Sequence, residues 1–188
     1  MDTYIALAHH PVRNKRGEEV ATAVTNLDIH DLARMARTFG VRGYYIVTPV
    51  SQQRSLVRRI TSHWIEGEGS SYNPTRAEAF TLVRVGENIA EVTEEIAKES
   101  GCNPVTVVTG AGFGEGAVSY DTLRERIHNE SGSCLLIFGT GWGLTTAFVE
   151  TCDLKLPGIA AQVANNGYNH LSVRSAVAII LDRLLGNR

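Results

Sequence analysis

Two short apolar runs, each followed at once by a cluster of glycines, constrain this chain more than any other feature. Val105 to Gly110 reads VTVVTG and enters GAGFGEGA, and Cys134 to Gly139 reads CLLIFG and enters GTGWGL. Such runs are typical of strands buried on both faces, as in a parallel sheet. In open α/β sheets, ligands bind beyond the carboxyl ends of the strands, and glycines let a backbone approach them closely. The two loops therefore predict a ligand site.

Strand-like and helix-like segments alternate along the rest of the chain. We expect strands at Asp2 to Ala8, Gly43 to Thr48 and Phe80 to Val85, and a short segment from Leu154 to Ile159 that is broken by Pro157 and Gly158. Helical spacing predicts helices at Leu27 to Phe39, Gln52 to Ile65, Asn88 to Lys98, Ser119 to Asn129 and Leu171 to Leu185. The polar segments Arg13 to Thr22 and Gly67 to Pro74 predict loops. The alternation favours one α/β domain over residues 1–188, with a mostly parallel sheet and helices on both faces.

Charge is distributed unevenly, although the net charge is only -2. Residues 1–60 hold nine Lys/Arg and five Asp/Glu, a net charge of +4, whereas residues 61–188 hold nine and fifteen, a net charge of -6. A basic third on an acidic body can present a surface to nucleic-acid phosphates. An uneven solvated surface is the alternative interpretation.

The basic residues of the first third follow two predicted helices. In the first, Ile29, Leu32, Ala36 and Phe39 form an apolar stripe, and the opposite face holds Asn26, His30, Arg34 and Arg37. In the second, Leu56, Ile60 and Trp64 form the apolar stripe, and Arg54 and Arg58 lie on another face. Both faces could bind phosphate, and exposed charged helix faces are the alternative.

We expect neither a signal peptide nor a membrane-spanning segment. Its first apolar run is short and follows an acid at position 2, and no apolar stretch approaches 18 residues. The three cysteines are odd in number and form no C-x-x-C pair. We expect a cytoplasmic protein with reduced, buried thiols.

Other ligand motifs fit less well. Gly112 to Ala117 loosely matches the dinucleotide pattern G-x-G-x-x-A, but the next strand ends in Gly139 and Thr140, which leaves no acid for a ribose hydroxyl. Only His9 and His10 of the six histidines are adjacent. No metal site is therefore expected.

Three segments together resemble the SPOUT methyltransferases, and in particular the tRNA ribose 2′-O-methyltransferases. The first family motif, N-x-G-x-x-x-R-[ST]-A, is similar to the segment from Asp28 to Gly40, and the interval from Arg34 to Gly40 is the same. The second motif, G-[ST]-E-x-x-G-[LI], is similar to GTGWGL, which lacks the Glu and is one residue shorter. The third is similar to Leu156-Pro157-Gly158 followed by YNHLSVRSAVAI, where His170 takes the place of an Asn and Ser172 is kept.

The resemblance implies a C-terminal deep trefoil knot and a pocket for S-adenosylmethionine (SAM), with S-adenosylhomocysteine as the product and no metal. The implied cofactor residues lie in four loops: Thr109, Gly110, Gly139, Thr140, Gly141, Trp142, Gly143, Leu144, Leu156, Ile159, His170, Leu171 and Ser172. Because the methyl group of a sulfonium is already activated, the protein has only to align an acceptor and help remove a proton.

The resemblance also implies an RNA substrate, tRNA or rRNA, with a ribose 2′-oxygen or, as in the tRNA guanine-N1 methyltransferases of the same fold, a base nitrogen as acceptor. Arg34, His30 and Asn26 are the implied catalytic residues, and Arg37, Arg54 and Arg58 are expected to bind RNA. Family members are typically homodimers, and a final helix that is apolar on nearly every face agrees with a dimer interface.

Two other functions remain alternatives at this point. A non-catalytic RNA-binding protein would need the basic helices but not the two glycine loops. A nucleotide-dependent oxidoreductase would need the loops but not the basic face, and the missing ribose acid disfavours it.

Overall fold

The computed structural model describes residues 1–160 and 168–187. A six-stranded sheet in the order β5-β4-β1-β7-β6-β8 forms its centre, and all its strand pairs are parallel. A separate antiparallel hairpin, β2–β3, follows β1. The strands are β1 (Asp2–Ala8), β2 (Val12–Arg13), β3 (Glu19–Val20), β4 (Gly43–Val47), β5 (Val83–Gly86), β6 (Val105–Thr109), β7 (Ser133–Gly139) and β8 (Leu154–Leu156).

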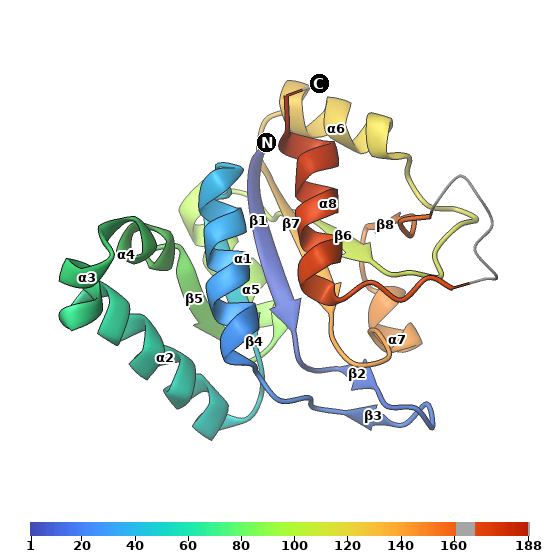
Figure 1. The fold of residues 1–188 in the computed structure, drawn as a ribbon. Coiled ribbons are helices and arrows are strands. Elements are labelled where there is room, and N and C mark those ends of the chain that lie inside the picture. Colours follow the sequence, from blue (N-terminus) through green and yellow to red (C-terminus); the bar gives the residue numbers. More distant parts are fainter. Residues whose placement is uncertain (161–167, 188) are drawn as a thin grey trace.

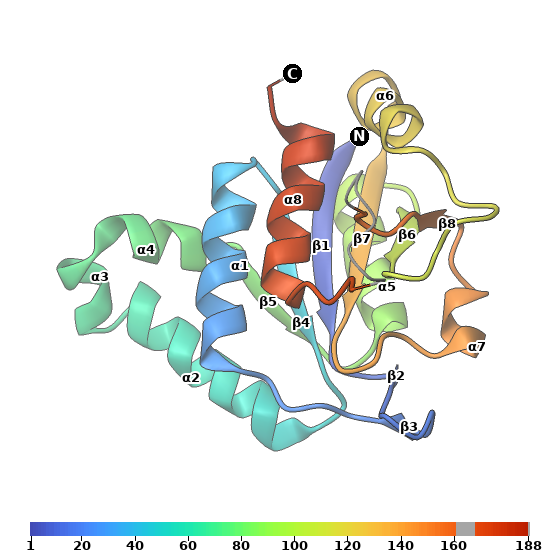
Figure 2. The same cartoon turned by 45° about the vertical axis from the view of Figure 1, so that its right-hand side comes forward.

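Helices cover both faces of the sheet (Figures 1 and 2). They are α1 (Asn26–Thr38), α2 (Ser51–Ile65), α3 (Glu68–Tyr72), α4 (Pro74–Phe80), α5 (Ile89–Ser100), α6 (Tyr120–Asn129), α7 (Thr146–Val149) and α8 (Val173–Leu185). The α1, α6 and α8 side chains pack in one core cluster, and the α5 and α7 side chains pack in the other. The predicted fold class is confirmed.

The central strands are buried as their sequence predicts. Along β1, Ile5 and Leu7 point into one core cluster, whereas Tyr4, Ala6 and Ala8 point into the other. All seven residues of β7 are buried or half-buried. Strands covered on both faces have no polar side, which is why the period-2 pattern of a surface strand is missing from CLLIFG.

The structure differs from the predicted secondary structure in two loops and at the start of one strand. The segment from Arg13 to Thr22 contains the β2–β3 hairpin, which turns through Gly17 at φ +82°. The expected loop from Gly67 to Pro74 contains α3 and the start of α4, and Phe80 ends α4 instead of opening a strand. Short helices such as α3 depend on packing against α2 and α4, and a periodicity argument cannot detect five residues.

Two predictions about burial also need correction. In α2, Val57 is the fully buried residue and Leu56 is 46% exposed, so the inward stripe is Val57, Ile60 and Trp64. Of the three free cysteines, Cys134 is buried but Cys102 is exposed. In α2 the topology is unchanged, because the neighbouring Val57 occupies the inward position.

The final helix has partners within the chain. It packs between α1 and α6 and buries Val177, Ile180, Leu181 and Leu184. No helix in the described ranges is both long and apolar enough to cross a membrane. The expected knot depends on the chain path through residues 161–167, which lie outside the described residues.

Candidate functional site

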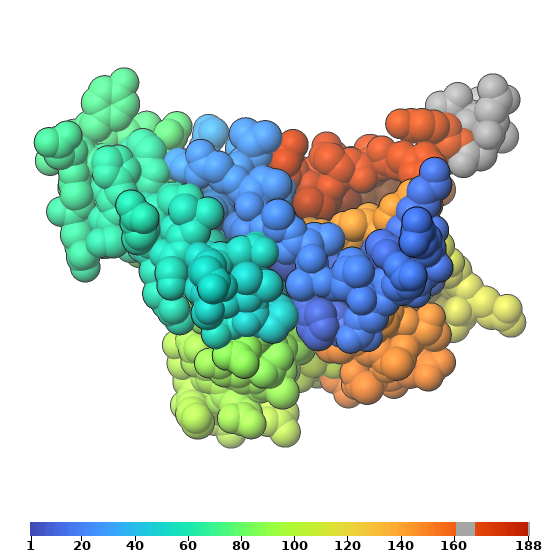
Figure 3. Space-filling view, turned by 90° about the horizontal axis from the view of Figure 1, so that it is seen from below, coloured from blue at the N-terminus to red at the C-terminus, as the bar shows by residue number. Residues whose placement is uncertain are grey.

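The winding of the sheet reverses between its two central strands, β1 and β7. The chain passes from β1 to β4 and β5 on one side, while β6 and β8 lie beyond β7 on the other. Such a switch point leaves a crevice beyond the carboxyl ends of the two strands. Figure 3 views the molecule from this edge, where residues near the N-terminus (blue) lie beside the region that follows β7 (orange).

The loop after β7 folds back tightly on its own strand. A Cβ atom added to Gly139 would lie 2.8 Å from Leu144 Cγ and 3.0 Å from the Leu144 backbone nitrogen. Gly141 and Gly143 have φ values of +59° and +89°, a region that side chains disfavour. All three glycines predicted from the sequence are therefore required by the backbone.

The β2–β3 hairpin holds this loop from the other side. Arg13 N donates to Gly143 O at 2.8 Å, Trp142 N donates to Arg13 O at 3.1 Å, and Val12 forms a bridge with Leu144. Thr140 Oγ1 donates to the carbonyl oxygen of Ala8 at 3.2 Å. The glycine loop is thus fixed by backbone groups on both sides.

The loops after β6 and β8 also meet through their backbones. A Cβ atom on Gly158 would collide with the Ala111 carbonyl group, and one on Gly110 would lie 2.8 Å from the Phe113 ring. Gly158 N donates to Phe113 O at 3.2 Å. Because β6 lies between β7 and β8, the three loops follow three neighbouring strands at one edge of the sheet.

The segment before α8 runs from the N-terminal end of that helix toward the loop after β6 (Figures 1 and 2). Ser172 caps α8 by accepting a hydrogen bond from Ser175 N at 3.2 Å. Arg174, in the first turn, donates to Asp28 at 3.0 Å and pairs with Asp31 at 3.3 Å, both on α1. This residue, which the motifs did not identify, ties the segment to α1.

His9 lies at the carboxyl end of β1 and is fully buried. Burial lowers the pKa of His9 to about 4, against an opposing effect of Asp28. Its Nδ1 lies 3.1 Å from Thr22 Oγ1, which in turn lies 2.5 Å from Thr140 Oγ1. Its Nε2 has no hydrogen-bond partner in the described chain. A neutral imidazole therefore supports the glycine loop through two hydroxyl groups.

The predicted cofactor residues fall into two groups. Leu144 and Leu156 are buried, and Thr109, Gly110, Gly139, Thr140, Gly143 and Ile159 are half-buried at the carboxyl edge. Gly141, Trp142, His170, Leu171 and Ser172 are exposed, and Trp142 is 58% exposed. Within residues 1–160 and 168–187, no cluster of three His, Cys, Asp or Glu side chains could hold a metal ion.

The predicted catalytic residues share α1 but not one environment. Asn26 is the first residue of the helix, at the carboxyl edge, and is exposed. Eight residues further on, Arg34 lies about 12 Å along the helix axis, at 1.5 Å per residue. The His30 ring packs edge-on against Trp64 and Phe80, with centroids 5.4 Å and 4.8 Å away. Burial, helped by Arg76, lowers the pKa of His30.

The three arginines predicted to bind RNA differ in how they are engaged. Arg37 donates from Nε to Glu78 at 2.9 Å, in an exposed ion pair. Arg54 is only 15% exposed; it donates to Thr48 O at 2.8 Å and pairs with Glu87 at 2.9 Å. Arg58 is exposed, and no described residue pairs with it. Arg54 is therefore already committed to the fold.

The sequence contained a signal for one of the missed features. The run VRNKRGEEV places strand formers on either side of a turn that contains glycine, which is a hairpin pattern. Nothing in the sequence indicated that Arg76 lies near α1 or that Arg174 reaches Asp28. Those contacts depend on tertiary packing.

Comparisons with known proteins identify the family of the chain. The family described as SAM-dependent RNA methyltransferase matches residues 2–186. A protein of Oleidesulfovibrio alaskensis named tRNA (guanine-N(1)-)-methyltransferase is 43% identical over 98% of the chain, but the chain spans only 42% of that relative's length. An uncharacterized protein of Aquifex aeolicus is 42% identical over 97% of the chain and 88% of its own length.

A solved structure, the SpoU methyltransferase AviRb from Streptomyces viridochromogenes in complex with AdoMet, shares the fold with a TM-score of 0.56. It is 16% identical and covers 97% of this chain and 58% of its own. The expected resemblance to SPOUT proteins is confirmed in fold. With a family match over nearly its whole length, the chain belongs to the SAM-dependent RNA methyltransferases.

Proposed function

We propose that this chain binds SAM in the loops after β6, β7 and β8 and transfers its methyl group to a nucleotide of tRNA. The single observation that carries the proposal is the loop from Gly139 to Leu144, which is closed against β7 and the hairpin without any side chain at its three glycines. Its backbone groups lie at the switch point of the sheet, where a nucleotide-like ligand is expected.

The residues present fit such a ligand. Because Gly139 has no side chain, Leu144 can fold back against the end of β7, and Leu144, Leu156 and Ile159 supply apolar surface at this edge for an adenosine. When bound, the sulfonium supplies an activated methyl group. The chain's own residues would hold the cofactor, exclude water and orient the acceptor.

The acceptor is proposed to be tRNA because the relative that is 43% identical is named for it. Guanine N1 is the first acceptor to test, and a ribose 2′-oxygen the second. On the acceptor side, Asn26 lies at the carboxyl edge, His30 supplies an imidazole whose pKa is lowered by burial and by Arg76, and Arg34 can orient the RNA. These roles are proposals for the three residues.

A homodimer in the cytoplasm completes the proposal. Leu27 at the start of α1 is 60% exposed, and Leu171 just before α8 is 47% exposed. The two helices are neighbours, so these apolar side chains support an interface on the α1–α8 face.

Binding of S-adenosylhomocysteine to Gly139→Ala and Lys98→Ala variants tests the cofactor site. The Cβ atom of the first variant would displace Leu144, whereas Lys98 is exposed on α5, away from the three loops. S-adenosylhomocysteine should raise the melting temperature of the wild type and Lys98→Ala but not of Gly139→Ala. Equal shifts in all three would remove the glycine loop from the site.

Mass spectrometry of nucleosides tests the acceptor. Bulk tRNA and rRNA lacking the modification are incubated with the protein and SAM, and the methylated nucleosides are fragmented. Added mass on the base identifies a nitrogen acceptor, and added mass on the sugar identifies the 2′-oxygen. Transfer to neither RNA by a protein that binds SAM would contradict the proposed activity.

A further inference from the structure

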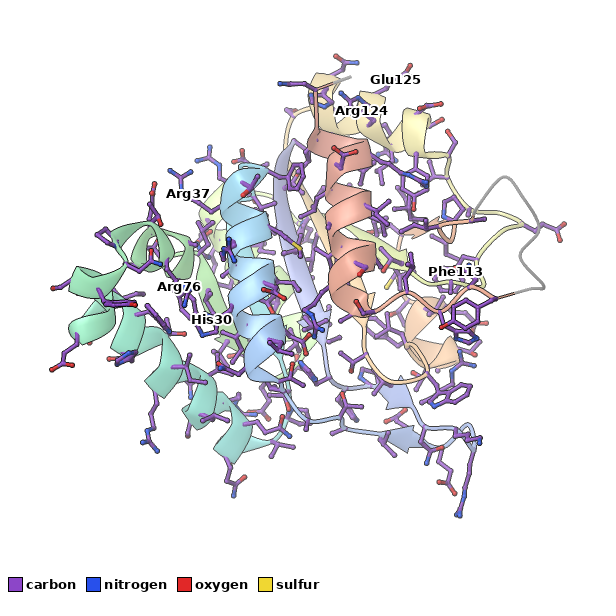
Figure 4. All side chains as sticks on the ribbon, viewed as in Figure 1. His30, Arg37, Arg76, Phe113, Arg124 and Glu125 are labelled. Atoms are coloured by element: carbon purple, nitrogen blue, oxygen red, sulfur yellow. The ribbon has the colours of Figure 1, made fainter. Side chains whose placement is uncertain are left out.

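A cleft of about 270 Å³ lies between α1 and α4. Arg34 and Arg37 line it from α1, and Arg76 lines it from α4. A cleft of this size can admit a phosphate group. Figure 4 shows Arg37 and Arg76 in the region between α1 and α4, with His30 on the same side of α1.

The charges in the cleft do not cancel. Glu78 is the one carboxylate among the described residues that line it, and it pairs with Arg37. No described carboxylate pairs with Arg34 or Arg76. Three guanidinium groups and one carboxylate leave a net positive cavity, which attracts anions.

Arg76 is held in place without its donors being used. Its guanidinium carbon lies over the Trp64 ring, 4.6 Å from the centroid, so a cation–π contact holds the group at this place. Its Nε is buried and has no hydrogen-bond partner in the described chain. A buried donor without an acceptor is unfavourable, and such groups are rare unless a ligand or water satisfies them. A fixed guanidinium also loses little entropy when it binds a phosphate in bidentate fashion.

From these contacts we infer that the cleft between α1 and α4 binds a backbone phosphate of the RNA, with Arg76 and Arg34 as its ligands. The inference rests on the proposed function and deepens it, because it gives the RNA a contact on the helical face, away from the glycine loops. Arg34 is then a positioning residue that acts through the RNA backbone. Glu78 orients Arg37 and weakens the site by repulsion.

Binding of unmodified tRNA at several salt concentrations tests the inference, with wild type, Arg76→Gln, Arg34→Gln and Glu78→Gln compared. Lys98→Gln is the matched control, since Lys98 is exposed on α5, on the opposite face of the sheet. Arg76→Gln and Arg34→Gln should each weaken binding about tenfold and lower the salt slope by about 0.7 to 0.9. Glu78→Gln should strengthen binding severalfold, and Lys98→Gln should leave it unchanged.

The increase expected for Glu78→Gln keeps the test meaningful if Arg76→Gln destabilises the fold, because misfolding does not raise affinity. Wild-type affinity and salt slope in Arg76→Gln would overturn the inference. A second outcome would also overturn it: inorganic phosphate stabilises the wild type but not Arg76→Gln, and both proteins bind tRNA with the same affinity. The cleft would then hold a free anion and not the RNA backbone. Binding of S-adenosylhomocysteine is measured in parallel and should not change in any variant. If neither the wild type nor any variant bound S-adenosylhomocysteine, the proposed function would be contradicted, but the inference about the cleft would not.

Discussion

The loop after β7 and the cleft between α1 and α4 differ in the groups that form their surfaces: main-chain groups in the loop and side chains in the cleft. In the loop, Gly139, Gly141 and Gly143 bring backbone groups together, and the contacts to the hairpin are hydrogen bonds between main chains. In the cleft, Arg34, Arg76 and Glu78 present side chains from two helices.

This difference determines what each region tolerates. A backbone-built surface fails when a Cβ atom is added, and it is insensitive to salt because its groups are dipoles packed against each other. A side-chain-built surface tolerates small changes of shape but depends on charge, and salt screens it. Changes of pH and replacement of charged side chains can therefore test how the two regions differ.

The largest effect expected is on the pH dependence of stability, through His9. Its pKa is about 4 in the folded protein and 6.5 in the unfolded chain, so the unfolded state binds more protons between these values. The stabilising contribution of neutral His9 is fully present above pH 6.5 and is lost as pH falls toward 4. At about 1.4 kcal/mol per pKa unit, the loss is on the order of 3 kcal/mol.

Urea unfolding of the wild type and His9→Gln at pH 7, 6, 5 and 4 measures this. Carboxylates titrate in both proteins, so only the difference between their curves reports on His9. The wild type should lose more stability than the variant between pH 6.5 and 4. Parallel curves would show that the buried imidazole is hydrated, and that the glycine loop is less tightly packed than its backbone contacts indicate.

A smaller effect is expected at Arg174, which joins the start of α8 to α1. Asp28 is almost fully buried, with 7% of its side chain exposed, while Arg174 is 31% exposed. Arg174→Met should cost about 2 kcal/mol, between about 1 kcal/mol for exposed pairs and 3 to 5 for buried ones. Because the residue also anchors the segment before α8, affinity for S-adenosylhomocysteine should fall.

The matched control is Arg58→Met, which removes an exposed arginine without a described partner. Chemical unfolding and cofactor titration of both variants, with Asp28→Asn and the double variant, give the coupling energy of the pair. A coupling near zero would mean that the Arg174–Asp28 pair contributes nothing to holding α1 and α8 together.

The sequence predicts the features built from the backbone better than those built from side chains of different helices. The glycine loops, the buried strands and most helix bounds were predictable, because apolar runs and glycines report on the backbone within a few residues. The cleft was not, since Arg34 and Arg76 meet only after α2, α3 and α4 have packed. Arg54 shows the limit most clearly: its position on the helix suggested a phosphate contact, but Glu87 and the Thr48 carbonyl already bind it.

The smallest effect expected separates Arg54 from Arg58, which the helix pattern placed together. Arg54→Ala removes a mostly buried guanidinium with two partners and should lower the free energy of unfolding by about 1 to 2 kcal/mol. Arg58→Ala should change stability by less than about 0.5 kcal/mol, as expected for an exposed side chain without a partner. If Arg58 contacts RNA, its loss should lower the salt slope of tRNA binding by about 0.7 to 0.9. Unfolding and tRNA binding are measured for both variants.

If Arg54→Ala is as stable as the wild type and binds tRNA less tightly, then the contacts of Arg54 to Glu87 and Thr48 are released when RNA binds. The basic surface would then extend along α2 from the carboxyl edge to the cleft.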